Sequence, residues 1–498
     1  MLGYWRSHAD YQRFVLNQLE QNSHFDPGSL KKYQNLTSKL WILNMDMLYE
    51  AIKPCYSSTG RPALLQPEIF RVFVAMTDQK IPIHNWTTTL ENDFVLHTIC
   101  GLKPSEIPKT SSFYDFMNRI VKLDERPKVK QFRRKPKKKL KKGEKLPPKH
   151  PQITTKLVKV IKEGRRLNHR PELILQKIFA VIVNQSLNLG LIGKTLSVCG
   201  DGTCIETGAC HYGKRICDCK DNGIYDCECN RKFSDPSATW GWDSHNERWF
   251  YGYTGYFLST YIKDLKIDLP LYIRLVEAKR HDSVSALVAL TEFKDLNPEL
   301  HIDTFISDCA SDNYATYDLL NFWNINAVIA LNKTNSGNSW YDDNININDN
   351  GVPICSAGHK MVYWGPCIEV NRSRYKWRCP RVLGKVEHCP ACDNCSPSDY
   401  GRVFYTKFNI EDLRLHPVIP RHSAEFKSKM NQRTACERIN NTILHTYGIE
   451  NSKTRGKKRI SFFSTMAAIN IHLDAQLTLL IKRRLFDFNA ISRYVLCA

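Results

Sequence analysis

The sequence lacks a long hydrophobic run, since no segment reaches the roughly 18 uninterrupted apolar residues that a membrane span needs. The amino-terminal stretch MLGYWRSHADYQRF also lacks the basic-then-apolar pattern of a secretory signal peptide. Both absences argue against a membrane protein and favour a soluble, cytoplasmic one. In that compartment the 18 cysteines are expected to be mostly reduced, so clustered cysteines predict metal binding before disulfides.

Acidic residues are scarce relative to basic ones. The 498 residues include 71 Lys and Arg against 50 Asp and Glu, a formal net charge of +21. This excess favours a polyanionic partner, nucleic acid or an anionic membrane. Hydrophobic residues at 42% and charged residues at 24% are globular values that exclude a disordered or fibrous chain, and the length predicts about three domains.

More than half of the net charge lies in residues 126–150, which contain thirteen Lys or Arg and one acid. Such a block repels itself and, with its prolines, is expected to be disordered when free. Lys135 and Lys138 are the candidate DNA-binding residues of this block. Release of counterions from the DNA would make such binding strong, insensitive to sequence and sensitive to salt. The alternative is a solvated linker.

The hydrophobic pattern changes along the chain. Residues 1–123 are typical of helices; Pro67 at a first helical position begins one that runs to Met76. Strands are predicted at 195–203, 249–262, 271–277 and 302–308, and helices at 171–187, 284–293 and 424–444. The predicted divisions are a helical amino-terminal domain (1–123), a basic disordered linker (124–152), the first part of an α/β core (153–333), a Cys-rich insertion (334–420) and a helical carboxyl-terminal part of the core (421–498).

Two acids stand out because each is next to a run that should be buried. Asp201 lies between two glycines in a predicted strand, and Asp308 ends another. Carboxylates at adjacent strand ends can hold hard divalent cations, and two such ions can support phosphodiester chemistry. Glu437 is the candidate third carboxylate, with Arg433 predicted one helical turn before it on the same face. Each Asp alone also fits a turn or cap residue.

Four motifs carry a resemblance to the DDE transposases of bacterial insertion sequences. They are Asp201 in VCGDGTCIET, Asp308 in FISDCASDNYATYDLL, Arg433 and Glu437 in NQRTACERINN, and the basic stretch KTRGKKRISFF. The segment YSSTGRPALLQPEIFRVFVAM also resembles the helical domain that precedes the catalytic core of such enzymes. The resemblance implies an α/β fold with an RNase H-like mixed sheet flanked by helices. Asp308 and Glu437 are 129 positions apart, and a strand-rich insertion would occupy part of the segment between them.

The resemblance also implies a function: metal-dependent cleavage of DNA at transposon ends and transfer of the freed strand into target DNA. Asp201, Asp308 and Glu437 would hold two Mg²⁺ or Mn²⁺ ions, and Arg433 would contact a backbone phosphate. The protein would act as a homodimer on DNA, in association with the nucleoid. Lys453 and Arg455 in the later basic stretch are further candidate DNA contacts.

The sequence departs from a related signature at two positions and offers near-miss residues. Met430 and Leu444 stand where that signature has Tyr and Lys; the candidate substitutes are Lys427, Lys429 and Lys453. Asp312 and Glu425 are the alternative acids, ranked below Asp308 and Glu437. His281-Asp282 resembles a recurrent His-Asp pair of these enzymes, but a helix-cap pair fits equally well.

Twelve of the 18 cysteines form two clusters, at 204–229 and 355–395. The run HCPACDNC in the second contains overlapping CxxC spacings typical of a structural zinc site. The predicted ligands are Cys379, Cys389, Cys392 and Cys395, with Cys355 and Cys367 as alternatives to Cys379. In the first cluster, zinc and free thiols remain equal alternatives.

Aromatic residues near basic ones raise a further binding question. Arg374 and Lys376 alternate with Tyr375 and Trp377, a pattern that suits either DNA contact or an amphipathic strand. The run WGWD at 240–243 is predicted to lie in the core.

Two other functions remain open. One is a non-catalytic DNA-binding protein derived from a transposase. The other is a zinc-dependent nucleic-acid-binding or nuclease module, in which the cysteines are primary and the acids incidental.

Overall fold

The computed structural model describes residues 1–21, 27–122, 129–131, 153–167, 172–244, 246–332, 346–348, 352–369, 372–407, 413–414, 417–421, 423–450, 454–489 and 491. The chain divides into two compact units. The first comprises Met1–Ile153, Arg166–His301 and Thr434–Ala498, and the second comprises Thr154–Arg165 and Ile302–Arg433. Within the described part of the chain, none of the helices combines the length and apolar character needed to cross a bilayer.

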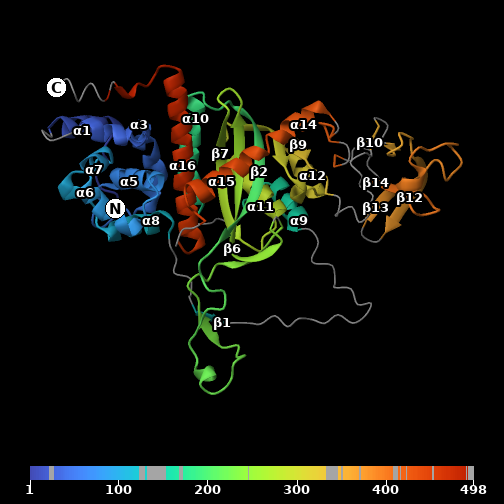
Figure 1. Cartoon of the computed structure of the whole chain (residues 1–498), viewed down its shortest axis with the longest axis horizontal. Helices are drawn as coiled ribbons and strands as arrows, with labels where there is room; N and C mark the ends of the chain where they lie inside the picture. Colours follow the sequence, from blue (N-terminus) through green and yellow to red (C-terminus); the bar gives the residue numbers. More distant parts are fainter. Residues whose placement is uncertain are drawn as a thin grey trace. The chain divides into compact units, whose positions relative to one another are not determined.

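The amino-terminal part of the first unit is helical, as predicted (Figure 1). Its α-helices are α1 (His8–Gln21), α2 (Pro27–Lys32), α3 (Gln34–Ile42), α4 (Tyr49–Ile52), α5 (Gln66–Asp78), α6 (Trp86–Asn92), α7 (Phe94–Ile99) and α8 (Thr110–Ile120). All of α5 except Asp78 is buried, with Pro67 in its first turn. The Phe73 ring packs edge-on against Trp86 at 4.7 Å between centroids and lies 5.6 Å from Phe116 of α8. These ring contacts join α5 to α6 and α8.

Helix α16 (Lys457–Lys482) packs against α3, α5, α10 (Leu173–Asn188) and β7 (Ile267–Glu277). Its interior includes a polar chain: Gln476 Nε2 donates to Ser186 Oγ at 2.9 Å, and His472 shares a 2.8 Å bond with the same hydroxyl. His472 Nε2 donates to the Pro270 carbonyl at 2.7 Å. These bonds give partners to the Ser186 hydroxyl, the His472 ring and the Gln476 Nε2 group inside the core.

The main sheet of the first unit is antiparallel. Strand β6 (Arg248–Ile262) pairs with β2 (Thr195–Glu206), β5 (Thr239–Asp243) and β7. Helix α11 (Asp282–Leu296) packs against β2, β6 and β7. The strands predicted at 195–203, 249–262 and 271–277, and the helices at 171–187 and 284–293, are therefore confirmed with shifted ends.

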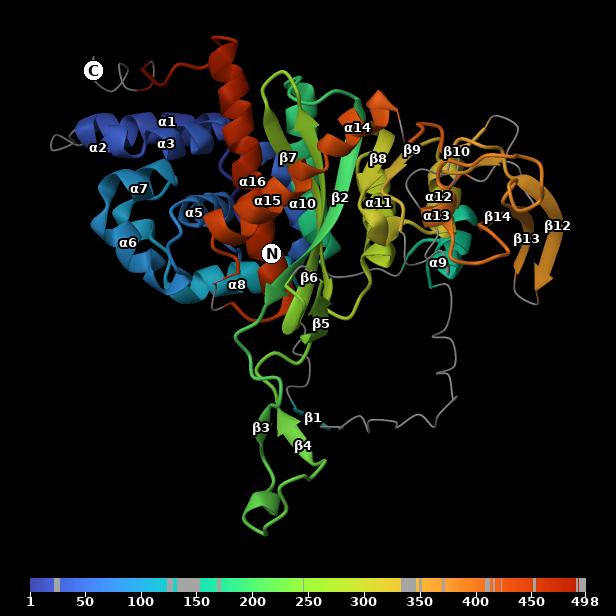
Figure 2. The same ribbon diagram turned by 45° about the vertical axis from the view of Figure 1, so that its right-hand side comes forward.

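An extension leaves this sheet after β2 and returns through β5 (Figure 2). It contains β3 (Lys214–Arg215), the short 3₁₀ helix η5 (Asp218–Lys220) and β4 (Asn230–Lys232). Strand β1 (Val129–Gln131) pairs with β4 and completes a three-stranded sheet. These three residues belong to the segment 124–152 that the sequence predicts to be a disordered linker, and in the structure they pair with β4. The other residues of the predicted linker, 124–128 and 132–152, lie outside the described residues.

The second unit contains a parallel strand pair and a small antiparallel sheet. Its elements are α9 (Ile153–Lys162), β8 (His301–Ser307), α12 (Tyr314–Phe322), β9 (Asn326–Ile329), β10 (Asn346–Ile347), β11 (Pro353–Ile354), β12 (Val362–Glu369), β13 (Arg372–Arg378), α13 (Cys392–Cys395), β14 (Val403–Lys407) and α14 (Ala424–Asn431). Strands β8 and β9 are parallel, and β12, β13 and β14 are antiparallel neighbours. The protein is therefore mixed α/β with a helical amino-terminal part and a Cys-rich region.

The helix predicted over 424–444 is instead interrupted. Helix α14 ends at Asn431, α15 spans Thr434–Asn441, and a π-helical turn, η7, covers Thr442–Thr446. The amides of Gln432 and Arg433 bond the carbonyls three residues earlier, at 2.9 and 3.0 Å. This tight turn ends α14, and α15 belongs to the first unit.

Candidate active site and metal centre

Asp201 lies in the middle of β2, opposite Phe257 of β6 in the antiparallel register. Its carboxylate is half-buried, and Oδ2 accepts a hydrogen bond of 3.1 Å from Asn440 Nδ2. Asn440 is 6% exposed and lies one helical turn after Glu437 on α15. The bond therefore ties the helix that carries Glu437 to the strand that carries Asp201.

Two further contacts hold α15, which packs against β2, β6 and β7 (Figure 1). Cys436 Sγ lies 3.9 Å from the Phe257 carbonyl, and Arg438 forms a bidentate ion pair with Asp268 at 2.5 and 2.8 Å. Ile439 is buried whereas Glu437 is exposed, as predicted for opposite sides of this helix. The packing presents the Glu437 carboxylate at the outer side of a well-anchored helix.

Asp282 lies on the other face of β2. A Cβ at Gly202 would be 2.6 Å from Asp282 Oδ1, so only glycine allows this carboxylate to pack there. Successive side-chain directions alternate across a strand, and Asp201 and Gly202 are adjacent. His281 caps α11, with Nδ1 accepting from the Ser283 amide at 3.2 Å. The pair His281-Asp282 is therefore a helix-cap pair, separate from the Asp201 carboxylate.

Asp308 directly follows β8 in the second unit, as predicted. It is half-buried, and its carboxylate accepts from the Ala310 amide at 3.0 Å, so it also caps the 3₁₀ turn that follows. Asp312, the alternative acid, is 2% exposed and forms a bidentate pair with Arg414 at 3.0 and 2.6 Å. Tyr317 Oη and the Asn332 amide also donate to it. Both Asp312 carboxylate oxygens therefore accept hydrogen bonds from neighbouring segments of the second unit.

The remaining predicted DNA contacts near this region have mixed outcomes. Arg433 lies in the turn before α15 and not on the helix, which corrects the predicted helical pairing with Glu437. Lys429 forms an ion pair with Asp303 at 3.3 Å. Lys135, Lys138 and Lys453 lie outside the described residues.

Arg455 lines a cleft of about 560 Å³ in the first unit. Lys80 and Arg459 line the same cleft, and the aromatic rings of Trp86, Tyr114 and Phe463 also contribute to its walls. Cations over an apolar and aromatic surface are a composition that suits a nucleic-acid strand. Spacing in the sequence did not connect Lys80 with Arg455, because they come from opposite ends of the chain.

Arg374 and Lys376 lie on β13, and the cationic group of each lies over a nearby tyrosine ring. The Arg374 guanidinium is 3.8 Å from the Tyr405 ring centroid, and Lys376 Nζ is 4.8 Å from that of Tyr400. Trp377 donates to Thr406 Oγ1 at 2.8 Å and packs on the small core around Phe404. These contacts favour the amphipathic strand for Trp377.

The WGWD run corrects a prediction. Trp240 and Trp242 on β5 are 43% and 50% exposed, whereas the alternate residues Gly241 and Asp243 are buried. The Trp242 ring lies 5.3 Å from that of Trp249, which is 65% exposed. Trp240 and Trp242, which were predicted to lie in the core, therefore belong to an aromatic group on the surface. The buried face of β5 is the one that carries Gly241 and Asp243.

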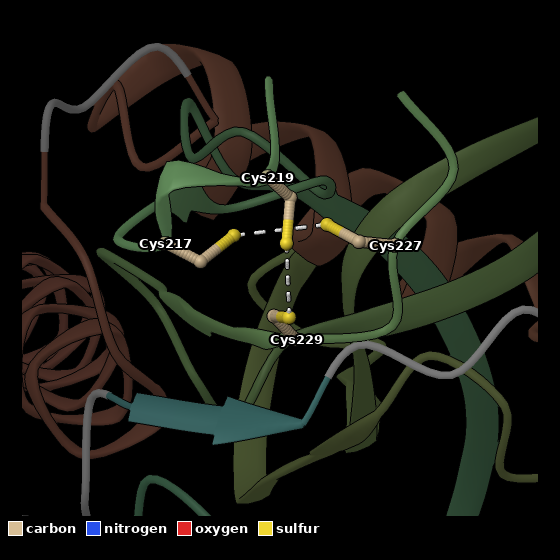
Figure 3. A group of neighbouring side chains, drawn as sticks. All are labelled: Cys217, Cys219, Cys227 and Cys229. Carbon is tan, nitrogen blue, oxygen red and sulfur yellow. Dashed lines mark hydrogen bonds between the residues drawn. The ribbon is translucent and has the colours of Figure 1, made fainter. Parts of the chain in front are cut away.

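Four cysteines of the extension meet at one point (Figure 3). The Sγ atoms of Cys217, Cys219, Cys227 and Cys229 all lie within 4.8 Å of one another. The Cys217–Cys227 separation is 3.7 Å and the Cys219–Cys229 separation is 3.5 Å. The backbone amide of Cys229 lowers the pKa of Cys227 to about 7, despite a smaller opposing effect of burial. The group can bind a metal such as zinc.

Among the described residues, this is the one group of three or more metal-ligating side chains with such close ligand atoms. Cys379, Cys389, Cys392 and Cys395 do not form such a group, and Cys355 is buried in the small core with Met361 and Phe404. The structure thus brings together the cluster with the less familiar CxC spacing. The signal in the sequence was two CxC pairs separated by a short loop.

No protein-family model matches the chain, and no curated protein matches it.

Proposed function

We propose that this protein is a DNA transposase of the DDE type, which cleaves DNA at transposon ends and joins the freed ends to target DNA. The observation that carries the proposal is the Asn440–Asp201 hydrogen bond, because it holds the helix of Glu437 against the strand of Asp201 within one unit. The motif resemblance supplies the reaction class. The third carboxylate of the proposal is Asp308.

The donor set fits Mg²⁺ or Mn²⁺, since carboxylate oxygens are the ligands these ions prefer. Asp201, Asp308 and Glu437 would hold two such ions, which would supply Lewis-acid stabilisation of attacking and leaving oxygens. Asn440 orients the Asp201 carboxylate by donating to Oδ2. Arg438 and Cys436 keep α15 in place.

The chemistry consists of two displacements at phosphorus. Water loses a proton and attacks a phosphodiester at the transposon end, which breaks the P–O3′ bond and leaves a 3′-hydroxyl. That hydroxyl then attacks a phosphodiester of target DNA and displaces its 3′-oxygen. Lys80, Arg455 and Arg459 around the cleft, and the exposed Trp240, Trp242 and Trp249, are the described residues best suited to hold DNA. Two ends must be brought together, so the proposal includes a homodimer on DNA.

The test is strand cleavage with Mg²⁺ on DNA that carries the sequences flanking the gene. Asp201→Asn, Asp308→Asn and Glu437→Gln should each reduce cleavage by at least about 100-fold, because each removes a charged metal ligand at nearly constant size. Glu425→Gln is the matched control, since Glu425 is an exposed acid on α14. Retained cleavage in any one of the three variants would remove that residue from the proposed triad.

Asn440 offers a second test, as a positioning residue. Asn440→Ala should lower cleavage about 10-fold and raise the Mg²⁺ concentration needed for half-maximal rate, because Asp201 loses its orienting donor. Asn441→Ala is its control, since Asn441 is the adjacent, exposed residue. Equal effects of the two substitutions on the Mg²⁺ dependence would contradict the positioning role.

The same experiment separates the alternatives. DNA binding without cleavage in the wild-type protein would indicate a non-catalytic DNA-binding protein. The four-cysteine group favours the zinc-dependent module as the second candidate. In that case, zinc removal would abolish nucleic-acid binding while Asp201→Asn left activity intact.

A further inference from the structure

The part of the extension at residues 210–230 has no hydrophobic core of its own. Among residues 210–230, none is buried, and Tyr212, Ile216, Ile224 and Tyr225 are 50–64% exposed. A segment of this size without a hydrophobic core needs a cross-link, a metal or a partner to keep one conformation. The four cysteines supply ligands at the place where such a cross-link would act.

The backbone delivers two cysteines from each arm of the extension. Strands β3 and β4 pair at Lys214↔Lys232 and Arg215↔Arg231, which brings the segments just after β3 and just before β4 side by side. Cys217 and Cys219 follow β3, and Cys227 and Cys229 precede β4 (Figure 3). Between the pairs, the Ile224 amide bonds the Cys219 carbonyl at 2.7 Å, and Gly223 has a φ of +74°, which glycine adopts without strain.

The spacing of the sulfur atoms matches tetrahedral coordination. A Zn–S distance of about 2.3 Å places the four sulfurs of a tetrahedral site about 3.8 Å apart. Two of the pairs measure 3.7 and 3.5 Å, and all four atoms lie within 4.8 Å of one another. A disulfide needs about 2.05 Å between sulfurs, and two disulfides do not require all four atoms to share one centre.

We propose that Cys217, Cys219, Cys227 and Cys229 bind one structural zinc ion that holds the extension folded. Binding converts four thiols to thiolates, releases their protons to solvent and gives a closed site without an open coordination position. The ion therefore has a structural role and takes no part in DNA cleavage. Because β1 pairs with β4, the zinc site also supports the three-stranded sheet that includes Val129–Gln131.

The experiment measures zinc in the full-length protein purified without chelator. The wild-type protein should carry about one zinc ion per chain. The double variant Cys219→Ser/Cys229→Ser should lose it, whereas the control Cys389→Ser/Cys392→Ser, in the CxxC motif, should keep it. Loss in the control with retention in the first variant would overturn the assignment, as would stoichiometric iron in place of zinc.

Wild-type protein provides a second measurement that does not depend on whether the variants fold. A strong chelator should expose residues 210–229 to limited proteolysis, and added Zn²⁺ should restore protection. Alkylation without reductant should find these four cysteines reduced. Two disulfides, or a cleavage pattern unaffected by chelator and zinc, would overturn the proposal. Asp201→Asn should retain zinc, so failure of the transposase proposal is distinguishable from failure of this one.

Discussion

Two Cys-rich regions of this protein differ in how their cysteines and their apolar side chains are arranged. The extension brings four sulfurs together and has no buried side chain over residues 210–230. The region of β12, β13 and β14 (353–407) instead has a small core of Cys355, Met361 and Phe404, and stacks Arg378 on the Tyr400 ring at 3.4 Å. Its CxxC cysteines do not converge in the described structure. Cysteine spacing alone therefore does not reveal which region depends on its sulfurs.

The physical reason is how each region offsets the conformational entropy lost on folding. Apolar burial does this in the β12–β14 sheet, at about 25 cal/mol per Å². The extension has no comparable buried area, and in our zinc proposal metal binding by its four cysteines offsets this entropy instead. Two predictions test this contrast, and a third tests the main body of the first unit as a reference; they are given from the largest expected effect to the smallest.

The β12–β14 region should depend on its apolar core. Phe404 is 4% exposed, and Phe404→Ala should destabilise this sheet by about 3–5 kcal/mol through lost burial and a cavity. Hydrogen exchange of the β13 and β14 amides would measure the loss. Val382→Ala, at a 45% exposed position of the same region, is the control and should change little. A chelator that loosened this sheet as much as Phe404→Ala would remove the contrast.

The main body of the first unit should respond to acid through His472. Burial lowers the pKa of His472 to about 4, against a smaller opposing effect of its bond to the Pro270 carbonyl. The pKa of His472 in the folded protein lies below its value of about 6.5 in the unfolded chain, so the unfolded chain binds the proton first as pH falls. The contribution of neutral, buried His472 to the free energy of unfolding is therefore complete above pH 6.5 and is lost as pH falls towards 4. The loss should reach about 3 kcal/mol.

Unfolding free energies of the wild type and His472→Gln across pH 4–7 would measure this effect. The variant should be less stable at pH 7 but should show a flatter pH dependence, because it lacks the titrating imidazole. Parallel pH profiles of the two proteins would rule out His472 as the cause. An acid effect confined to the extension would instead assign the sensitivity to the cysteines.

The smallest effect should come from the apolar side chains of the extension. Ile224 is 50% exposed, so Ile224→Ser should change the unfolding free energy by less than about 0.5 kcal/mol. Zinc content and protease protection of residues 210–229 should also stay unchanged. A large loss of protection would show that Ile224 contributes to a hidden apolar contact and would break the comparison between the two regions.

Local sequence patterns predicted much of the secondary structure. Pro67 and the apolar spacing after it predict α5, and the β-branched and aromatic runs predict β2, β6 and β7. These succeed because helix and strand periodicities are set by near neighbours. The break after Asn431 was missed because the segment is helical on both sides and only two amide bonds turn the chain. Trp240 and Trp242 were misplaced because alternation does not say which face of a strand is covered.

For the candidate sites too, the sequence pattern selected individual residues, and the fold decided which of them meet. Asp201, Asp308 and Glu437 were selected from strand ends and motifs, but the bond from Asn440 that ties Glu437's helix to Asp201 joins residues 239 apart in the chain. Likewise, the CxC pairs are visible in the sequence, whereas their convergence depends on the pairing of β3 with β4.

The sequence by itself determined the unequal charge, the helical amino-terminal part, the alternation of strands and helices, and the residue types able to bind metals. These depend on composition and on side chains a few positions apart. Tertiary structure alone decided which cysteines meet, which acid is committed to an arginine, and which tryptophans remain exposed. Those outcomes depend on pairing between distant segments, where strand register and packing set distances that no local spacing specifies.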